Sequence, residues 1–283
     1  MAQDKLIWKI VLDFAILLCV GAPLLAFVIW GEAPKVGFFE DDRSLRLPYK
    51  EETISETWLA AVGFAFMVAT VVIIEFVRDR KGRSVGEKFL CGSLIPGWLW
   101  ESYITIGVFT FGAACQQLTA EVTKYVTGRL RPHFYAVCRP VYDTSLPANS
   151  QGYIQEYTCS NTEISENRIS QMRLSFPSAH ASFAMYVAVF WILYIQIKGK
   201  WRGSKLLRHG MQLAVFLAAW YVGLSRVVEH FHHWEDTAFG FFIGIVYGVL
   251  VIPFILKPKR YVPSAWQDSA PQENMLPRPV LAR

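Results

Sequence analysis

Charged residues are scarce in this chain. Only 18% of its 283 residues are charged, whereas 53% are hydrophobic and 15% aromatic, and the mean hydropathy is +0.28. Soluble domains carry more charge and fewer apolar side chains than this. The composition therefore predicts an integral membrane protein.

Long runs of basic residues are also missing. The net charge is +5 at pH 7, but the basic residues fall in short clusters beside apolar runs, where anchoring at a membrane surface explains them. We therefore expect the bilayer, and no nucleic acid, as the partner of these clusters.

No clear signal-peptide cleavage site follows the first apolar run, residues 11–30. The run is long, contains Asp13, and is followed by acidic Glu40, Asp41 and Asp42. A secretory signal has a shorter apolar region and ends in small residues, so we expect this run to be retained as a first membrane span. The chain also lacks an Asn-x-Ser/Thr triplet, and we expect no N-linked glycosylation.

Cysteine is infrequent, with five residues. Cys19 and Cys115 lie in apolar runs, and Cys91 lies in a segment expected to face the reducing cytoplasm. Cys138 and Cys159 share a segment expected to face an oxidising compartment. We expect a disulfide between these two, worth about 3 kcal/mol for a loop of that size; two unpaired thiols are the alternative.

Six apolar runs are long enough to cross a bilayer, which takes about 20 helical residues. They lie near residues 10–30, 57–77, 103–126, 179–197, 211–227 and 237–256. Gln116, Gln117 and Glu121 interrupt the third run, and polar groups at that depth face other helices or a water-filled cavity. The predicted fold is therefore all-α, a polytopic membrane protein with six transmembrane helices in one domain, residues 1–256.

Charge in the connecting segments predicts the orientation. Basic residues cluster after the second, fourth and sixth runs, whereas acidic residues predominate after the first. Because Lys and Arg near span ends stay in the cytoplasm, both termini are expected there, and the loops 127–178 and 228–236 face outward. Residues 257–283 contain five prolines among polar residues and are expected to form a disordered cytoplasmic tail.

The first of three polar motifs begins where the third run ends. Lys124 and Arg131 are seven residues apart, close to two helical turns, so both cations project from one face if the helix continues. They can then bind the same phosphate. The alternative is a basic cluster that reaches lipid headgroups, a role that also suits Arg129.

The second motif, Pro177-Ser178-Ala179-His180, precedes the fourth run. Pro and Ser favour a helix start, which presents free N–H groups and the positive end of the helix dipole to an anion. We expect the Ser178 hydroxyl and the Ala179 amide to face a phosphate, and His180 to deliver a proton. An ordinary interfacial histidine is the alternative.

In the third motif, His232 and Asp236 are four residues apart. On a helix this spacing lets the carboxylate accept a hydrogen bond from one ring nitrogen and leaves the other nitrogen free as a nucleophile. Arg226 stands six residues before His232, so we expect the chain to turn and bring both into one cleft. Zinc held by His232 and Asp236 is the alternative, which the nearby cations disfavour.

In order and spacing, the motifs Lys-x6-Arg-Pro, Pro-Ser-x-His and Ser-Arg-x5-His-x3-Asp resemble those of the type 2 phosphatidic acid phosphatase superfamily. Within it, the chain is similar to the lipid phosphate phosphatases, also in the stretch Pro48-Tyr49-Lys50-Glu51. The resemblance implies that His232 forms a phosphohistidine, that Asp236 orients it, and that His180 protonates the leaving alcohol and then activates water. The phosphoryl oxygens would be held by Lys124, Arg131, Ser178, Ala179 and Arg226.

Ala179 departs from the pattern, which usually has glycine at this position. The backbone N–H survives the change, but the methyl group crowds the phosphate if the position needs a positive φ. The expected consequence is a change in rate, with the chemistry retained.

The resemblance further implies a phosphatase that needs no Mg²⁺ or other cofactor, because fixed cations and a helix end stabilise the developing charge. Its substrates would be phosphatidate, lysophosphatidate, ceramide 1-phosphate and sphingosine 1-phosphate. The alternatives are phosphotransfer to an alcohol, hydrolysis of a soluble sugar phosphate, and a catalytically silent lipid-binding scaffold. We expect an extracellular site at the plasma membrane, with a lumenal site in the endoplasmic reticulum or Golgi as the alternative; the preferred lipid and the oligomeric state, a homo-oligomer included, stay open.

Overall fold

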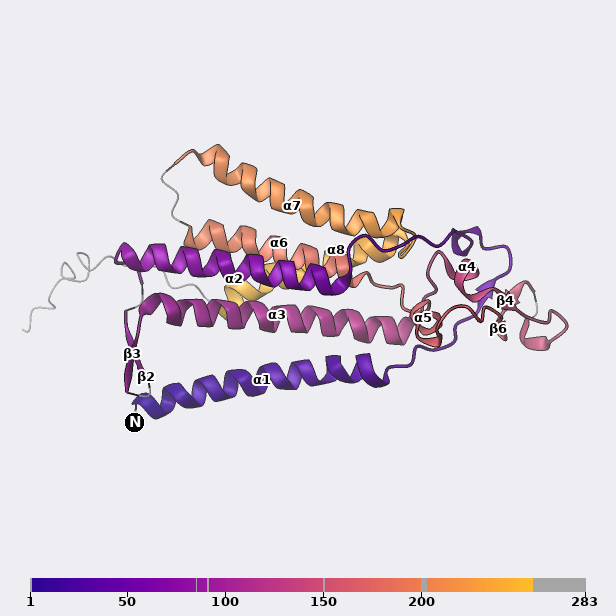
Figure 1. Ribbon diagram of the computed structural model, residues 1–283, viewed down its shortest axis with the longest axis horizontal. Helices are drawn as coiled ribbons and strands as arrows, with labels where there is room; N and C mark the ends of the chain where they lie inside the picture. Colours follow the sequence, from indigo (N-terminus) through magenta and orange to yellow (C-terminus); the bar gives the residue numbers. More distant parts are fainter. Residues whose placement is uncertain (1, 85, 91, 150, 200–202, 257–283) are drawn as a thin grey trace, which may run out of the picture.

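Six long helices lie side by side in the computed structural model, which describes residues 2–84, 86–90, 92–149, 151–199 and 203–256 (Figure 1). The helices are α1 (Ala2–Trp30), α2 (Glu56–Arg80), α3 (Gly97–Thr127), α6 (Ala179–Lys198), α7 (Lys205–Val228) and α8 (Trp234–Val251), which a π-helical turn, η3 (Ile252–Leu256), extends. Each coincides with one of the six apolar runs. The all-α membrane fold is therefore confirmed, while the expected tail, residues 257–283, lies outside the described residues.

Five of these helices are long and apolar enough to cross a membrane, namely Leu6–Trp30, Glu56–Arg80, Ala179–Lys198, Lys205–Val228 and Trp234–Leu256. The 31-residue α3 is not among them, although it runs alongside the others (Figure 1). It packs against α1, α2, α6 and α8. Its Gln116 is fully buried and accepts a hydrogen bond from the Ser182 hydroxyl of α6, so this polar group faces another helix, as expected.

The helix α6 is the centre of the bundle. It contacts α2, α3, α7 and α8, and its N-terminal half is buried. Close packing with α8 depends on small residues, because a Cβ on Gly244 would lie only 2.3 Å from the Ser182 carbonyl oxygen. The first turn of α6, which carries the second motif, is thereby fixed against the first turns of α8.

A buried ion cluster ties three helices together at the far end from the motifs. Lys198 of α6 lies 3.1 Å from Glu75 of α2 and 2.6 Å from Glu101 of α3. Arg78 and the Tyr194 hydroxyl also bind Glu75, at 3.1 and 2.9 Å. Buried charges are tolerated only when they are paired in this way, so the cluster fixes the lateral order of α2, α3 and α6.

A small cap covers the opposite end of the bundle, where α3 ends and α6 and α8 begin (Figure 1). It contains α4 (Phe134–Cys138), α5 (Glu166–Gln171), the short turns η1 (Arg43–Leu45) and η2 (Pro147–Asn149), and the antiparallel pairs β1 (Phe38–Phe39) with β5 (Tyr153–Ile154) and β4 (Pro140–Val141) with β6 (Thr158–Cys159). A disulfide joins Cys138 and Cys159, with their Cα atoms 4.6 Å apart. The hairpin β2 (Lys88–Leu90) and β3 (Ser93–Ile95) lies at the other end, near the N-terminus.

Candidate active site

A tight turn between α7 and α8 brings Arg226 and His232 together. His230 adopts a left-handed conformation, with φ of 64°, which reverses the chain. The amides of Phe231 and His232 then donate to the Arg226 carbonyl oxygen, at 3.0 and 3.3 Å. The sequence spacing predicted this turn, and α8 begins only after it, at Trp234.

The His232 ring has one fixed tautomer. Its Nδ1 lies 2.6 Å from the Ser175 carbonyl oxygen, and because a carbonyl can only accept, Nδ1 carries the proton. The Nε2 atom of the neutral ring then has a free lone pair. Burial lowers the pKa of His232 well below its usual range, and the positive charge of Arg131 lowers it further. The ring is therefore neutral at physiological pH and suited to nucleophilic attack.

Asp236 does not bind His232 directly, which corrects the pairing expected from their spacing. Its Oδ2 lies 4.0 Å from His232 Nδ1, beyond hydrogen-bond distance. His232 precedes α8, so the helical four-residue rule does not apply to this pair. Asp236 instead closes a capping box, accepting the His233 amide at 3.0 Å, and it also accepts the Ser175 hydroxyl at 2.6 Å. It reaches His232 only through Ser175.

Arg129 is the other partner of Asp236, at 2.6 Å, and it also pairs with Glu235 at 3.1 Å. The suggestion that Arg129 reaches lipid headgroups is therefore wrong for this structure. Its guanidinium neutralises the buried carboxylate of Asp236, which is 0% exposed.

The second motif forms the start of α6. Ser178 is its N-cap and accepts the Ala181 amide at 3.4 Å, while the Ser178 amide donates to the Asp236 carbonyl oxygen at 3.0 Å. Ala179 is the first helical residue and does not have a positive φ. The backbone strain considered for alanine at this position is absent, and the first-turn amides of Ala179 and His180 have no carbonyl partner within the helix.

The three cations come from three segments: Lys124 from α3, Arg131 from the loop that follows it, and Arg226 from α7. The guanidinium carbons of Arg131 and Arg226 lie 5.4 and 4.5 Å from the centre of the same Phe231 ring. Lys124 is 2.7 Å from Glu121, one turn earlier on α3. The shared helical face expected for Lys124 and Arg131 is wrong, because α3 ends at Thr127 and Gly128, with φ of 59°, turns the chain.

Backbone hydrogen bonds after the end of α3 position Arg131. Its amide donates to the Met172 carbonyl oxygen at 2.8 Å, and the Ser175 amide donates to the Arg129 carbonyl oxygen at 3.0 Å. These bonds align residues 129–131 with the segment that precedes the second motif. Within the described part of the chain, no carboxylate lies within ion-pair distance of Arg131.

Glu52 is a site residue that the sequence analysis missed. Its Oε1 lies 3.2 Å from Arg226 Nη2 and 3.3 Å from His180 Nε2. The Ile54 carbonyl oxygen accepts from Arg226 at 3.0 Å and lies 3.1 Å from His180 Nε2. The hydrogen bond with His180 lowers the pKa of Glu52, and the charge of Arg226 adds to the effect. The segment before α2 thus links His180 to Arg226.

Further hydrogen bonds fix the segment before α2 against the end of α7. Lys50 donates to the Val228 carbonyl oxygen at 2.8 Å, and the Thr53 amide donates to Glu229 at 3.2 Å. Glu229 also pairs with Arg226, at 3.0 Å. Glu52 directly follows the stretch Pro48-Tyr49-Lys50-Glu51, whose family resemblance does not by itself single out this carboxylate.

Zinc ligation by His232 and Asp236 finds little support in the geometry. Among the described residues, no group of three or more His, Cys, Asp or Glu side chains is arranged to hold a metal ion. The Asp236 oxygens are engaged by Arg129, Ser175 and His233. The residues present fit an anion better than a cation.

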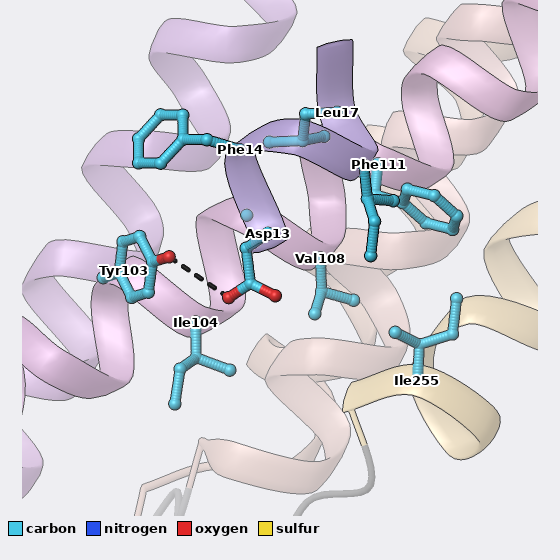
Figure 2. Close-up of a pocket in the computed structure, with 10 residues that line it drawn as sticks. Asp13, Phe14, Leu17, Tyr103, Ile104, Val108, Phe111 and Ile255 are labelled. Atoms are coloured by element: carbon cyan, nitrogen blue, oxygen red, sulfur yellow. Dashed lines mark hydrogen bonds between the residues drawn. The ribbon is translucent and has the colours of Figure 1, made fainter. Parts of the chain in front are cut away.

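Two of the cavities along α3 differ in their relation to the motifs. One, of about 350 Å³, lies between α1 and α3 near the N-terminal end of α3, where the Tyr103 hydroxyl donates to Asp13 at 3.2 Å (Figure 2). It contains no residue of the three motifs. The other, of about 300 Å³, is lined by Ala179 and His180 and by apolar residues of α1, α2 and α3. Of these two, the second connects the motif residues Ala179 and His180 with the apolar layer.

Comparison with known proteins agrees with this arrangement. Residues 105–260 match the PAP2 superfamily. A Drosophila melanogaster protein, provisionally named a phosphatidate phosphatase, is 39% identical over 89% of this chain and 70% of its own length. Phospholipid phosphatase 1 of Rattus norvegicus is 34% identical over 87% of this chain and 84% of its own length. Phospholipid phosphatase 2 of Bos taurus is 34% identical over 94% and 86%.

No solved structure matches the chain. The family match covers more than half of the sequence and includes all three motifs. The chain therefore belongs to the PAP2 superfamily.

Proposed function

We propose that this protein is a membrane phosphatase that hydrolyses lipid phosphate monoesters through a phosphohistidine on His232. The observation that carries the proposal is the His232 ring, neutral, held at Nδ1 by Ser175, and close to the charges of Lys124 and Arg131. A neutral imidazole with one free nitrogen beside fixed cations is the arrangement that attack on an anionic phosphate requires.

In the first step, His232 Nε2 attacks phosphorus and the bond from phosphorus to the ester oxygen breaks. His180 donates its proton to the departing alkoxide, so a neutral alcohol leaves. In the second step, His180 accepts a proton from water as the water oxygen attacks phosphorus, and the phosphorus–nitrogen bond breaks. Inorganic phosphate leaves, and both histidines regain their starting protonation states.

The phosphoryl oxygens are bound by Lys124, Arg131 and Arg226, by the Ser178 hydroxyl and by the first amides of α6. These groups carry the charge stabilisation that a metal ion supplies in other phosphoryl-transfer enzymes. Activity is therefore expected in the presence of a chelator. Asp236 keeps Ser175 and Arg129 in place and affects the orientation of His232 indirectly, through Ser175.

The proposed substrates are phosphatidate, lysophosphatidate, ceramide 1-phosphate and sphingosine 1-phosphate, whose chains stay in the apolar layer while the phosphate reaches the site. The names of the relatives, which refer to phosphatidate and phospholipids, support this class. The charge pattern of the connecting segments supports cytoplasmic termini and a site on the opposite side of the membrane. We propose the plasma membrane, with the endoplasmic reticulum or Golgi as the alternative.

Phosphate release from lysophosphatidate in EDTA tests the proposal, with wild type compared with His232→Ala. We expect the variant to lose at least 1,000-fold in kcat. His209→Ala is the matched control, since His209 lies in α7 outside the three motifs and, among the described residues, hydrogen-bonds Gln212 of the same helix, at 2.9 Å. Equal release by wild type and His232→Ala would overturn the mechanism, and no release by wild type would favour the scaffold. Recovery of a phosphorylated alcohol in place of free phosphate would identify a phosphotransferase.

A further inference from the structure

The 300 Å³ cavity beside His180 has the form of a groove that leads from the site into the bundle. Its walls are apolar side chains of four helices, including Leu24 of α1, Leu59 and Phe64 of α2, Ala113 of α3 and Phe183 of α6. From Gln117 to Thr110, both of which line it, α3 descends roughly 10 Å. This volume is at the lower end of the range for ligand cavities and suits one alkyl chain.

The outer end of the groove is acidic. Glu56, the first residue of α2, lines it together with Gln117 and His180. Gln117 donates to Glu56 Oε1 and to Glu121 Oε1, each at 3.1 Å, and Glu121 is already paired with Lys124. No bond from a described residue reaches Glu56 Oε2. One carboxylate oxygen is therefore available at the junction between the groove and the site.

Glu56 also lies within electrostatic range of the phosphate cations. Burial lowers the pKa of Arg131 to about 10, the charge of Arg226 lowers it as well, and the carboxylates of Glu52 and Glu56 oppose both effects. A ligand with its phosphate on these cations and its chain in the groove must pass its connecting carbons beside Glu56.

We propose that Glu56 is a specificity-determining residue that binds the ammonium group of a single-chain 2-amino alcohol phosphate. The inference rests on the proposed function of the same site. An ammonium on the carbon next to the phosphate-bearing carbon forms a charge-assisted hydrogen bond with the open carboxylate oxygen. The corresponding position of lysophosphatidate carries a neutral hydroxyl, and an N-acylated amine carries no charge, so neither gains as much from Glu56.

A purely structural role for Glu56 predicts a different result. As a first-turn acid, Glu56 stabilises the start of α2 and accepts from Gln117. Glu56→Gln keeps an oxygen that accepts from Gln117 and removes only the charge. A structural role would then affect all substrates alike, whereas recognition of an ammonium affects only substrates that carry one.

The experiment measures kcat/KM of the full-length protein in mixed micelles for sphingosine 1-phosphate and for its N-acetyl derivative. We expect Glu56→Gln to lower kcat/KM roughly 3- to 5-fold for the amine, chiefly through KM, and less than 2-fold for the derivative. Glu51→Gln is the matched control, because it removes the same charge from an exposed residue that does not line the groove. It should change neither value.

An equal loss for both lipids, or no loss for either, would overturn the role of Glu56. Those results leave the proposed phosphatase intact, because phosphate is still released. If wild type releases phosphate from neither lipid nor from lysophosphatidate, the proposed function itself fails, and the inference fails with it.

Discussion

The His232 imidazole is held by the backbone of Ser175, whose carbonyl oxygen lies 2.6 Å from Nδ1. The Ser175 side chain is held in turn by Asp236, at 2.6 Å. The carboxylate and the imidazole are therefore coupled through one residue, which donates its hydroxyl to the carboxylate and accepts the imidazole N–H at its carbonyl oxygen. Removal of the Asp236 carboxylate or of the Ser175 hydroxyl should therefore affect the orientation of the His232 ring in the same way.

The first prediction concerns this relay. Asp236→Asn and Ser175→Ala should each lower kcat by roughly 10- to 100-fold, as expected for partners that orient a reacting group. The double variant should lose little more than the worse single variant, because both changes break the same link. Single-turnover rates of the three variants measure this. Multiplicative losses would show that Asp236 acts on the reaction by a separate route, such as its pairing with Arg129.

The second prediction concerns Glu52. Because its carboxylate binds both His180 and Arg226, Glu52→Gln should lower kcat for a soluble aryl phosphate about 10-fold, and inorganic phosphate should bind more weakly. Glu51→Gln provides the control for loss of one acidic charge on the same segment. If Glu52 instead blocked the phosphate position, the variant would show a lower KM and stronger inhibition by phosphate. Steady-state kinetics with phosphate as inhibitor separate the two results.

Two expectations that were based on helical residue spacing were wrong. A spacing rule for helices was applied to His232 and Asp236 and to Lys124 and Arg131, and it failed for both pairs because a helix starts or ends between the partners. The motifs still identified the residues that converge, since their chemical types are required wherever the chain turns. Convergence is determined by tertiary contacts such as the bond from Ser175 to Arg129, which no local pattern encodes.

The fold was easier to predict than the contacts. Runs of about 20 apolar residues have few stable conformations other than helices in lipid, so the six helices followed directly from the sequence. The paired strands β1 with β5 and β4 with β6 have two residues each, too few for a periodic pattern. Glu52 was missed for a related reason, because an acidic residue in a polar loop has no distinguishing neighbours in sequence.

The third prediction concerns stability as a function of pH. His133 is fully buried, and burial lowers its pKa from 6.5 to about 4. Below pH 6.5 the unfolded chain binds a proton that folded His133 does not, so stability decreases as the pH falls, until folded His133 also titrates near pH 4. The shift corresponds to about 3 kcal/mol over this range. Thermal unfolding at several pH values should show a shallower acid decline for His133→Gln than for wild type, and an unchanged slope would contradict the assignment.

The fourth prediction tests whether the groove beside His180 holds the lipid chain. Ala60 of α2 lines this groove, so Ala60→Trp should fill it and lower kcat/KM for lysophosphatidate roughly 10-fold or more. Release from a soluble aryl phosphate, which has no chain, should change less than 2-fold. Ile73→Trp, at a side chain of the same helix that is 61% exposed, controls for the bulk of the added ring. A comparable loss with the soluble substrate would mean that the substitution disturbs the site itself, and full activity on the lipid would mean that its chain lies elsewhere.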